Sequence, residues 1–264
     1  MDKDNILQRI VDTKRREVTA MTNRLSRTLI HNLAEDSERS RRSMSKSIKT
    51  GSGIIAEFKR RSPSKGEISP MGNVSSIATI YAENGASAIS VLTDAPFFGG
   101  TDSDLVQTRI AAPDTPIIRK EFIIDEYQID MARIIGADAI LLIAAVLDYD
   151  ETSRLTDYAH SLGLEVLLEL HSEREISEYV KIDADMLGIN NRDLTSFTTD
   201  CNISARLCEL LPHDKVRIAE SGMHVPADVT RLRNLGFDGF LIGEALMKSS
   251  DPATTLRAFI NAHE

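Results

Sequence analysis

Cysteine is scarce in this sequence of 264 residues, in which only Cys201 and Cys208 occur. Two thiols seven positions apart on one expected helix fit a reduced core better than a disulfide framework or a metal site. The six histidines are scattered and no H-E-x-x-H motif is present. The sequence therefore predicts acid and base chemistry that uses no metal and no cofactor.

Long apolar runs are also missing. The longest, Ala139 to Leu147, is far shorter than the roughly 20 residues that a membrane-spanning helix needs. The start, MDKDNILQRI, lacks the apolar core of a secretory signal, so we expect a cytoplasmic protein with no membrane partner. The net charge of -9 argues against a nucleic-acid partner, although a local basic pocket can still bind an anionic small molecule.

Nucleotide-binding fingerprints are absent as well, because the sequence has neither a G-x-G-x-x-G nor a Walker motif. The chain does contain eight short β-rich runs from about residue 50 onward. They are GIIAEFK (53–59), ASAISVLT (86–93), TPIIRKEF (115–122), ADAILLIAA (137–145), LEVLLELH (164–171), ADMLGINN (184–191), KVRIAESG (215–222) and FDGFLIGE (237–244).

Segments of helical period lie between these runs, for example 74–84, 127–135, 153–162 and 226–235. Several end in similar phrases, ENGASAI, IIGADAI and NLGFDGF, in which a glycine ends the helix before the next strand. An open doubly wound sheet usually has five or six strands and a dinucleotide fingerprint. Eight βα units in about 200 residues instead predict an α/β protein with a (β/α)8 TIM barrel.

Residues 1–48 do not follow this repeat, and we expect them to form an N-terminal helical extension packed on a barrel domain of residues 49–264. Residues 6–21, ILQRIVDTKRREVTAM, are predicted to be helical. Residues 37–47, SERSRRSMSKS, are predicted to be a polar connector whose basic side chains face solvent.

Polar residues occur at the carboxyl ends of five of the eight expected strands. In (β/α)8 barrels these ends surround the mouth that holds the active site. Each such residue alone could be a solvated rim charge or half of a structural ion pair. The set favours a site, because burying several charges without function costs several kcal/mol per ion. Its members are Glu57, Lys59, Lys120, Glu169, Asn190, Glu220 and Ser221.

The last two strands end in glycine-containing turns, Glu220-Ser221-Gly222 and Gly243-Glu244. Turns at this position of a barrel often bind a phosphate through backbone N–H groups. A glycine at such a turn is also common for steric reasons alone. We favour a phosphate site formed by Ser221, Gly222, Gly243 and Glu244.

In these motifs the sequence resembles the indole-3-glycerol phosphate synthase family of tryptophan biosynthesis. The matching segments span nearly the whole chain in the family's order: IIAEFKRRSPSKG, SVLTDAPFFGG, IIRKEFI, LLELH, GINNRDL, AESGM and FLIGEALM. The resemblance implies a carboxy-lyase of aromatic amino acid biosynthesis. Its reaction would be ring closure of 1-(2-carboxyphenylamino)-1-deoxyribulose 5-phosphate to indole-3-glycerol phosphate, with loss of carbon dioxide and water. The resemblance also implies a monomer.

The same resemblance implies roles for single residues. Lys120 is expected to be the general acid that protonates the keto oxygen, while Lys59 orients the substrate and takes part in proton transfer. Glu169 and Glu57 are expected to stabilise the cationic intermediate and to assist dehydration, and the two roles are interchangeable at this stage. Asn190 and Glu220 match residues that bind the substrate hydroxyls and keep the active site in its working geometry. Ser221, Gly222, Gly243 and Glu244 match the residues that bind the phosphate end of the substrate.

Further residues are implied around these. Phe98, Phe122 and Leu141 match an apolar wall for the anthranilate ring, with plain core packing as the alternative. Ser62 and Arg192 match groups that serve the anionic substrate or the loops, and loop 60–66 is expected to be a mobile lid. Burial and neighbouring cations are expected to lower the pKa of the active lysine toward working pH. Two departures from the family pattern, Glu121 and Leu170, should point away from the barrel axis.

Two other functions compete with this one. A sugar-phosphate isomerase barrel, such as phosphoribosylanthranilate isomerase, normally needs a Cys or Asp base and an Asp acid, which the lysine and glutamate set fits poorly. A barrel that binds a phosphorylated ligand without turnover would be expected to lack part of the acid–base set, and no part is missing here.

Overall fold

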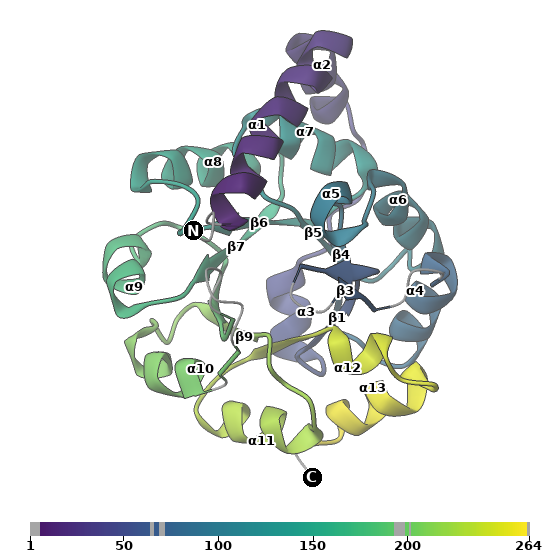
Figure 1. Ribbon diagram of the computed structural model, residues 1–264, viewed down its shortest axis with the longest axis vertical. Helices are drawn as coiled ribbons and strands as arrows, with labels where there is room; N and C mark the ends of the chain where they lie inside the picture. Colours follow the sequence, from purple (N-terminus) through teal and green to yellow (C-terminus); the bar gives the residue numbers. More distant parts are fainter. Residues whose placement is uncertain (1–5, 64–65, 69–71, 193–198, 201, 263–264) are drawn as a thin grey trace.

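Eight parallel strands form a closed barrel in the part of the chain that the structure, a computed structural model, describes: residues 6–63, 66–68, 72–192, 199–200 and 202–262 (Figure 1). The strands follow one another around the barrel in chain order, and the last pairs with the first. They are β1 (Ile54–Phe58), β4 (Ala88–Leu92), β5 (Ile117–Lys120), β6 (Ala139–Ile143), β7 (Glu165–Leu170), β8 (Met186–Asn190), β9 (Val216–Glu220) and β10 (Gly239–Ile242). Each predicted run contains one of them, and the TIM barrel prediction is confirmed.

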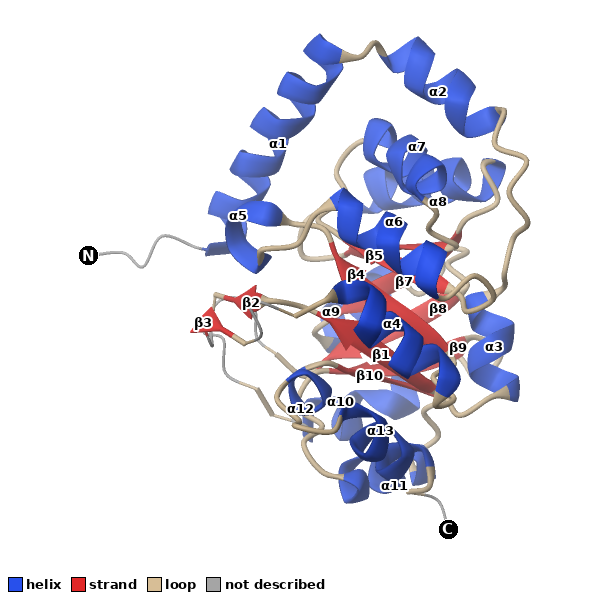
Figure 2. Cartoon of the chain, turned by 90° about the vertical axis from the view of Figure 1, so that its right-hand side faces the viewer, coloured by secondary structure: helices blue, strands red, loops and turns tan. Residues whose placement is uncertain are grey.

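Helices connect the strands and surround the barrel, as Figure 1 shows. They are α4 (Val74–Glu83), α5 (Ala95–Phe98), α6 (Asp102–Ala111), α7 (Glu126–Ile135), α8 (Tyr149–Ser161), α9 (Glu173–Tyr179), α10 (Asn202–Leu207), η1 (Cys208–Leu210), α11 (Pro226–Asn234), α12 (Glu244–Met247) and α13 (Pro252–Ile260). After β1 a short antiparallel pair, β2 (Arg61–Ser62) and β3 (Gly66–Glu67), stands outside the barrel (Figure 2). Cys208 is a buried free thiol in η1, whereas Cys201 lies outside the described residues.

Strand alternation sorts the side chains into two cores. One face of each strand packs against the helices, in a cluster that includes Ala56, Leu142 and Leu168. The other face fills the barrel with Ile55, Ile118, Leu167 and Ile218, among others. Two positions further along each of these four strands, the same face carries a charged residue: Glu57, Lys120, Glu169 and Glu220. The period of two therefore fills the lower barrel with apolar side chains and puts charge at its mouth.

The N-terminal segment forms α1 (Ile6–Arg24) and α2 (Arg27–Glu35), which confirms the predicted first helix. Leu25 and Ser26 separate them. Ser26 caps α2, because its hydroxyl oxygen accepts a hydrogen bond from the backbone N–H of Leu29. Figure 2 shows α1 at the same end of the barrel as α5, β2 and β3. No helix in the described ranges is long and apolar enough to cross a membrane.

The other end of the barrel is closed by α3 (Met44–Thr50), whose Met44 and Ile48 pack among the barrel-filling side chains. The prediction of a polar connector over 37–47 is therefore wrong for residues 44–47, because the two apolar residues four apart on one helical face were overlooked. The expectation that its basic side chains face solvent is also wrong for Arg39, which is partly buried and bonds to Asp138. The boundary expected after residue 48 falls inside α3.

Candidate active site

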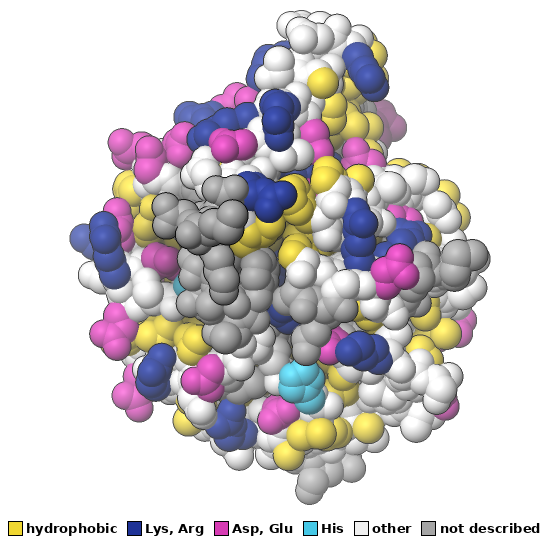
Figure 3. Space-filling view, in the orientation of Figure 1, with side chains coloured by type: hydrophobic (Ala, Val, Ile, Leu, Met, Phe, Trp, Pro, Cys, Tyr) yellow, Lys and Arg dark blue, Asp and Glu magenta, His cyan; other side chains and the backbone are white. Residues whose placement is uncertain are grey.

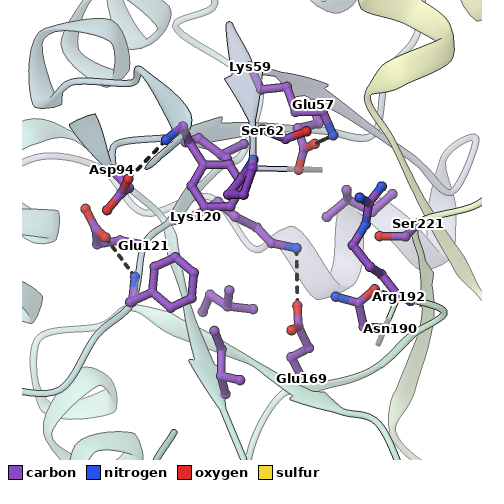
Figure 4. Close-up of a pocket in the computed structure, with 17 residues that line it drawn as sticks. Glu57, Lys59, Ser62, Asp94, Lys120, Glu121, Glu169, Asn190, Arg192 and Ser221 are labelled. Carbon is purple, nitrogen blue, oxygen red and sulfur yellow. Dashed lines mark hydrogen bonds and ion pairs between the residues drawn. The ribbon is translucent and has the colours of Figure 1, made fainter. Parts of the chain in front are cut away.

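The barrel mouth holds a pocket that brings together side chains from widely separated parts of the chain (Figure 4). Among the residues predicted for the site, those that line it are Glu57, Lys59, Ser62, Phe98, Lys120, Phe122, Leu141, Glu169, Asn190, Arg192 and Ser221. An adjoining pocket is lined by Gly222, Gly243 and Glu244 and shares Glu57, Lys59, Arg192 and Ser221 with the first. Glu220 lies directly beneath, fully buried and bonded to Lys120. Hence every predicted residue lies at one end of the barrel.

Lys120 is the centre of an ion cluster at the mouth. Its ammonium Nζ donates a hydrogen bond to Glu220 Oε2 and lies 3.5 Å from Glu169 Oε2. Figure 4 shows the lysine side chain extending from β5 across the pocket toward Glu169. On the opposite wall Lys59 donates to Glu57 Oε1 over 2.6 Å. We refer to these five residues, Glu57, Lys59, Lys120, Glu169 and Glu220, as the mouth cluster.

The surroundings of Lys120 correct one expectation. Burial lowers the pKa of this ammonium group, but the carboxylates of Glu220, Glu169 and Glu57 outweigh burial and hold the pKa above its ordinary value. The expected lowering by burial and neighbouring cations is therefore wrong, because the charges nearest to Lys120 are negative. Lys120 is held as an ammonium, which makes it a standing donor for an oxygen that gains negative charge.

Glu169 and Glu220 face the same ammonium yet shift in opposite directions. Burial tends to raise the pKa of Glu169, but Lys120 and His171 overcome burial and lower it. Burial also raises the pKa of Glu220, and the nearby Glu169 adds to that rise against the opposing effect of Lys120. Two like charges on one site cannot both ionise easily, so one carboxyl of the pair holds a proton more readily than the other. Such a split is the usual basis for separate acid and base roles.

Glu220 occupies space beside β8 that the glycine at position 188 leaves open. A Cβ atom at Gly188 would come within 2.3 Å of Glu220 Oε1, so any other residue there would force this carboxylate to shift. Gly243 makes room for Glu57 in the same way, since a Cβ there would come within 2.5 Å of Glu57 Oε1. Both glycines thus allow a carboxylate to approach the backbone of the neighbouring strand.

Glu57 is fully enclosed and remains ionised. Burial works to raise the pKa of this carboxyl, but Lys59, Lys120 and Arg192 together bring it below its ordinary value. Its second oxygen, Oε2, lies 3.5 Å from the hydroxyl of Ser90 on the neighbouring strand. Glu57 is therefore an available base held next to a lysine.

The turn after β9 has a strained backbone. Ser221 has a φ of 67°, a conformation that residues other than glycine rarely adopt, and Gly222 follows with a φ of 82°. The buried Asn191 holds this turn, because its amide Nδ2 donates to the carbonyl of Ser221 over 3.0 Å. Its Oδ1 accepts the backbone N–H of Ser204. Strain that is fixed by dedicated hydrogen bonds at a pocket wall is typical of binding sites.

The apolar wall of the pocket is formed by Phe98, Phe122 and Leu141, the residues predicted for it. The rings of Phe98 and Phe122 pack with their centroids 6.0 Å apart. Phe98 lies at the end of α5, whose start is capped by Asp94 through hydrogen bonds from the backbone N–H groups of Phe97 and Phe98. Ser62 lines the pocket from β2. Of the expected lid, residues 64 and 65 lie outside the described part of the chain.

Sequence reasoning missed a buried lysine beside this wall. Lys14 of α1 has a side chain only 3% exposed and lies 2.8 Å from Asp94 Oδ2 and 3.2 Å from Glu121 Oε1. It also contacts Glu17 over 2.7 Å. We call Lys14, Glu17, Asp94 and Glu121 the anchor cluster. The sequence could have indicated this buried lysine, because Lys14 lies on the otherwise apolar stripe of the first helix.

The two departures from the family pattern also have defined places. Glu121 lines the pocket, but its carboxylate accepts from Thr93 Oγ1 and pairs with Lys14, not with Lys120. Leu170 packs in the cluster between barrel and helices, as the alternation predicted.

Charged side chains of both signs alternate over the face that carries the mouth. In Figure 3 the dark blue and magenta residues are interspersed among the described side chains of this face. The positive charges that line the pockets, Lys59, Lys120 and Arg192, are therefore a local feature inside the mouth.

Comparison with solved structures shows that the fold is shared with other barrels. 3-Hexulose-6-phosphate synthase from Salmonella typhimurium superposes with a TM-score of 0.65 at 13% identity, covering 80% of this chain and 98% of that one. Thiamine phosphate pyrophosphorylase from Pyrococcus furiosus gives 0.62 at 16% identity, covering 83% and 97%. At these identities the likeness concerns the fold alone.

Comparison of sequences shows the family. The model of the family described as indole-3-glycerol phosphate synthase matches residues 7–259. The protein of that name from Bacteroides thetaiotaomicron is 49% identical over 263 residues, which is 98% of each chain. Those from a Nocardioides species and from Azospirillum brasilense are 46% and 37% identical, covering 78% and 97% of this chain and 79% and 99% of theirs. The chain belongs to the indole-3-glycerol phosphate synthase family.

Proposed function

We propose that this chain closes the indole ring of its family's substrate with the residues gathered at the mouth. The substrate would be 1-(2-carboxyphenylamino)-1-deoxyribulose 5-phosphate, and the products indole-3-glycerol phosphate, carbon dioxide and water. The observation that carries this proposal is the mouth cluster, in which an ammonium from β5 lies between carboxylates of β7 and β9. An aromatic wall borders it on one side.

The two ends of such a substrate have matching surroundings. Phe98, Phe122 and Leu141 offer an apolar surface to the anthranilate ring. The pocket with Gly222, Gly243 and Glu244 offers the phosphate a strained turn and the cations of Lys59 and Arg192. Figure 4 places Asp94 and Glu121 on one side of Lys120 and Ser221 and Arg192 on the other. A molecule with an aromatic end and a phosphate end would therefore carry its keto group past Lys120.

Ring closure begins when the ring carbon that bears the carboxylate attacks the ketone. The carbonyl oxygen gains negative charge, and Lys120 donates its proton to that oxygen. The ring and its nitrogen gain positive charge at the same time, which the carboxylates of Glu169 and Glu57 offset. Carbon dioxide then leaves with its bonding electrons returned to the ring, so no external base is needed for that step.

Dehydration completes the indole. The hydroxyl formed from the ketone leaves as water, and a proton must reach it while another leaves the substrate. Lys59 and Glu57, hydrogen-bonded over 2.6 Å, and the carboxyl of Glu220 are the groups within the mouth that can exchange these protons. Asn190 lines the same pocket and offers an amide to the substrate hydroxyls.

One assay tests the proposal. Purified protein is supplied with the carboxyphenylamino-deoxyribulose phosphate, and formation of the indole product is followed by its fluorescence. We expect turnover that is lost in Lys120→Met. Folded wild-type protein that binds this substrate without converting it would reject the synthase in favour of a binding barrel. Conversion of phosphoribosylanthranilate instead would point to the isomerase.

We further propose that the protein acts as a cytoplasmic monomer without a nucleic-acid partner. The monomer is supported by the predicted site residues of this chain, which line the two adjoining pockets together. Sedimentation equilibrium at working concentration should give the mass of one chain, 29.2 kDa.

A further inference from the structure

His171 follows the last residue of β7 and was not among the predicted site residues. It stands two positions after Glu169, so the two side chains leave the strand in the same direction. Its side chain is 14% exposed, and Nε2 lies 3.3 Å from Glu169 Oε1. His171 is not among the residues that line the main pocket of the mouth, so it acts on this pocket through Glu169.

A second carboxylate lies on the other side of the ring. His171 Nδ1 is 3.5 Å from Oε2 of Glu175, in the first turn of α9. The same carboxylate oxygen accepts the backbone N–H of His171 over 2.6 Å. Glu175 thereby holds the backbone of His171 by a hydrogen bond and lies within ion-pair distance of its ring. A neutral imidazole has only one N–H, whereas a ring with a carboxylate at each nitrogen can use two.

Glu169 therefore bridges two cationic groups. Its Oε2 faces Lys120, and its Oε1 faces His171. Lys120 also bonds to Glu220 and gives up its proton in the proposed reaction. When that happens Glu169 loses the positive charge in front of it while it remains buried. A buried carboxylate without a partner takes up a proton, because its charged form is costly away from water.

We propose that His171 is a positioning residue whose imidazolium, held by Glu175, keeps the carboxylate of Glu169 oriented and ionised throughout the catalytic cycle. This inference rests on the proposed function, in which Glu169 acts on the substrate. Within the described part of the chain, the charged groups that face His171 are Glu169 and Glu175, with Lys120 next beyond Glu169.

The electrostatics of the ring agree with this geometry. Burial lowers the pKa of His171, but the hydrogen-bonding and charge effects of Glu169 and Glu175 exceed burial and raise the pKa to about 10. Because the folded pKa lies above the unfolded value, the charge of His171 stabilises the fold fully below about pH 6.5 and ceases to do so as pH rises toward about 10.

The test compares His171→Gln, which loses the charge, with His171→Lys, which keeps one. The matched control is His160→Gln, since His160 forms a similar pair with Asp185 over 2.9 Å on α8, remote from the mouth. We expect kcat of His171→Gln to fall about 10-fold to 100-fold, the size seen when groups that orient metal ligands are removed. KM should stay within about twofold, because His171 does not touch the substrate.

Three further results complete the test. The variant His171→Lys should recover part of the kcat that His171→Gln loses. In His171→Gln the acidic limb of the pH profile of kcat/KM should lie at higher pH than in the wild type. The NMR chemical shifts of the ring nitrogens in the wild-type protein at pH 8 should be those of an imidazolium. The control should resemble the wild type. A neutral ring at pH 7, wild-type kcat in His171→Gln, or no gain from lysine would overturn the proposal.

The ring measurement needs no substrate. If the wild-type protein fails to turn over, the proposed function is rejected, and the nitrogen shifts still decide whether His171 is a cation. The difference in melting temperature between wild type and His171→Gln should also shrink as pH rises from about 6.5 toward about 10.

Discussion

Two ion clusters lie at opposite ends of the barrel and differ in how their charges are matched. The bottom cluster consists of Arg39, Arg42, Arg109 and Asp138, where the chain enters β6. Asp138 is the single carboxylate, 1% exposed, and its oxygens accept from Arg39 over 3.1 Å, from Arg109 and from the backbone N–H of Ile117 over 2.9 Å. The arginines also bond to backbone carbonyls, for example Arg109 to Thr115 over 2.9 Å.

The mouth cluster has the opposite balance, with three carboxylates and two lysines. Glu220 Oε1 has no hydrogen-bond partner among the described residues, and Glu220 and Glu169 shift their pKa values apart. Both carboxylate oxygens of Asp138, by contrast, accept hydrogen bonds. The comparison teaches that buried ions stabilise a fold when every oxygen has a fixed donor, and remain available for proton transfer when carboxylates compete for one cation.

The largest effect should follow from Lys120→Met. Removing the proton donor lowers kcat by about 1000-fold or more, since general acid catalysis and stabilisation of the developing oxyanion are lost together. Isothermal titration with inorganic phosphate should still detect binding, because the phosphate end is separate from Lys120. A variant with wild-type kcat would show that the mouth cluster is structural, like the bottom cluster.

The second effect, on stability, should follow from Asp138→Asn. We expect a loss of about 2 to 4 kcal/mol in the free energy of unfolding, because the partly buried arginines lose their counter-charge. Urea unfolding measures the loss, and kcat at a temperature where the protein is folded should not change. The control is Asp183→Asn, whose side chain is 84% exposed in a surface pair with Lys215. That change should cost less than about 1 kcal/mol. A reduced kcat in folded Asp138→Asn would show that the bottom cluster contributes to catalysis as well as to stability.

The anchor cluster is expected to contribute both to stability, like the bottom cluster, and to substrate binding, like the mouth. The variant Lys14→Met tests both contributions. Removal of this buried ammonium leaves Asp94 and Glu121 without their partner, and we expect a loss of about 2 to 4 kcal/mol. Asp94 caps α5, and Glu121 Oε1 accepts the backbone N–H of Phe122 over 2.8 Å. KM should therefore rise several-fold through the aromatic wall, while kcat changes less. Stability loss with an unchanged KM would make α1 a purely structural addition.

The smallest effect concerns pH. The pKa of Glu220 is raised from 4.5 to about 7, so the folded protein binds a proton there more tightly than the unfolded chain. Ionisation of Glu220 therefore lowers wild-type stability as pH rises through this window. Glu220→Gln has no such proton to lose, and its melting temperature relative to wild type should increase by a few degrees between those pH values. A constant difference would mean that the carboxyl of Glu220 has the same pKa in the folded and the unfolded chain.

Much of the fold followed from local pattern. The run ILQRIVDTKRREVTAM predicts a helix because its apolar residues recur every three to four positions. The run ADAILLIAA predicts a strand buried on both faces because it is short and continuously apolar. Polar residues at the strand ends predicted the site at the mouth, because the carboxyl ends of all strands meet there in this fold. The helix α3, whose Met44 and Ile48 close the bottom of the barrel, was missed because a seven-residue helix in a basic segment gives only a weak sequence pattern. Lys14 and Asp138 were missed because they pair with residues far away in the sequence. His171 was overlooked although Glu169 and Glu175 stand within four positions of it.

The sequence by itself determined the order of βα units, which strand faces carry charge, and the family to which the chain belongs. Only the tertiary structure decided how those charges balance. The pKa of Lys120 rises because carboxylates from β1, β7 and β9 happen to be its nearest neighbours, and Coulomb energies depend on distances that no local pattern contains. The carboxylates of Glu169 and Glu175 stand close to His171 in the sequence, but only the fold brings both of them to the two sides of its ring.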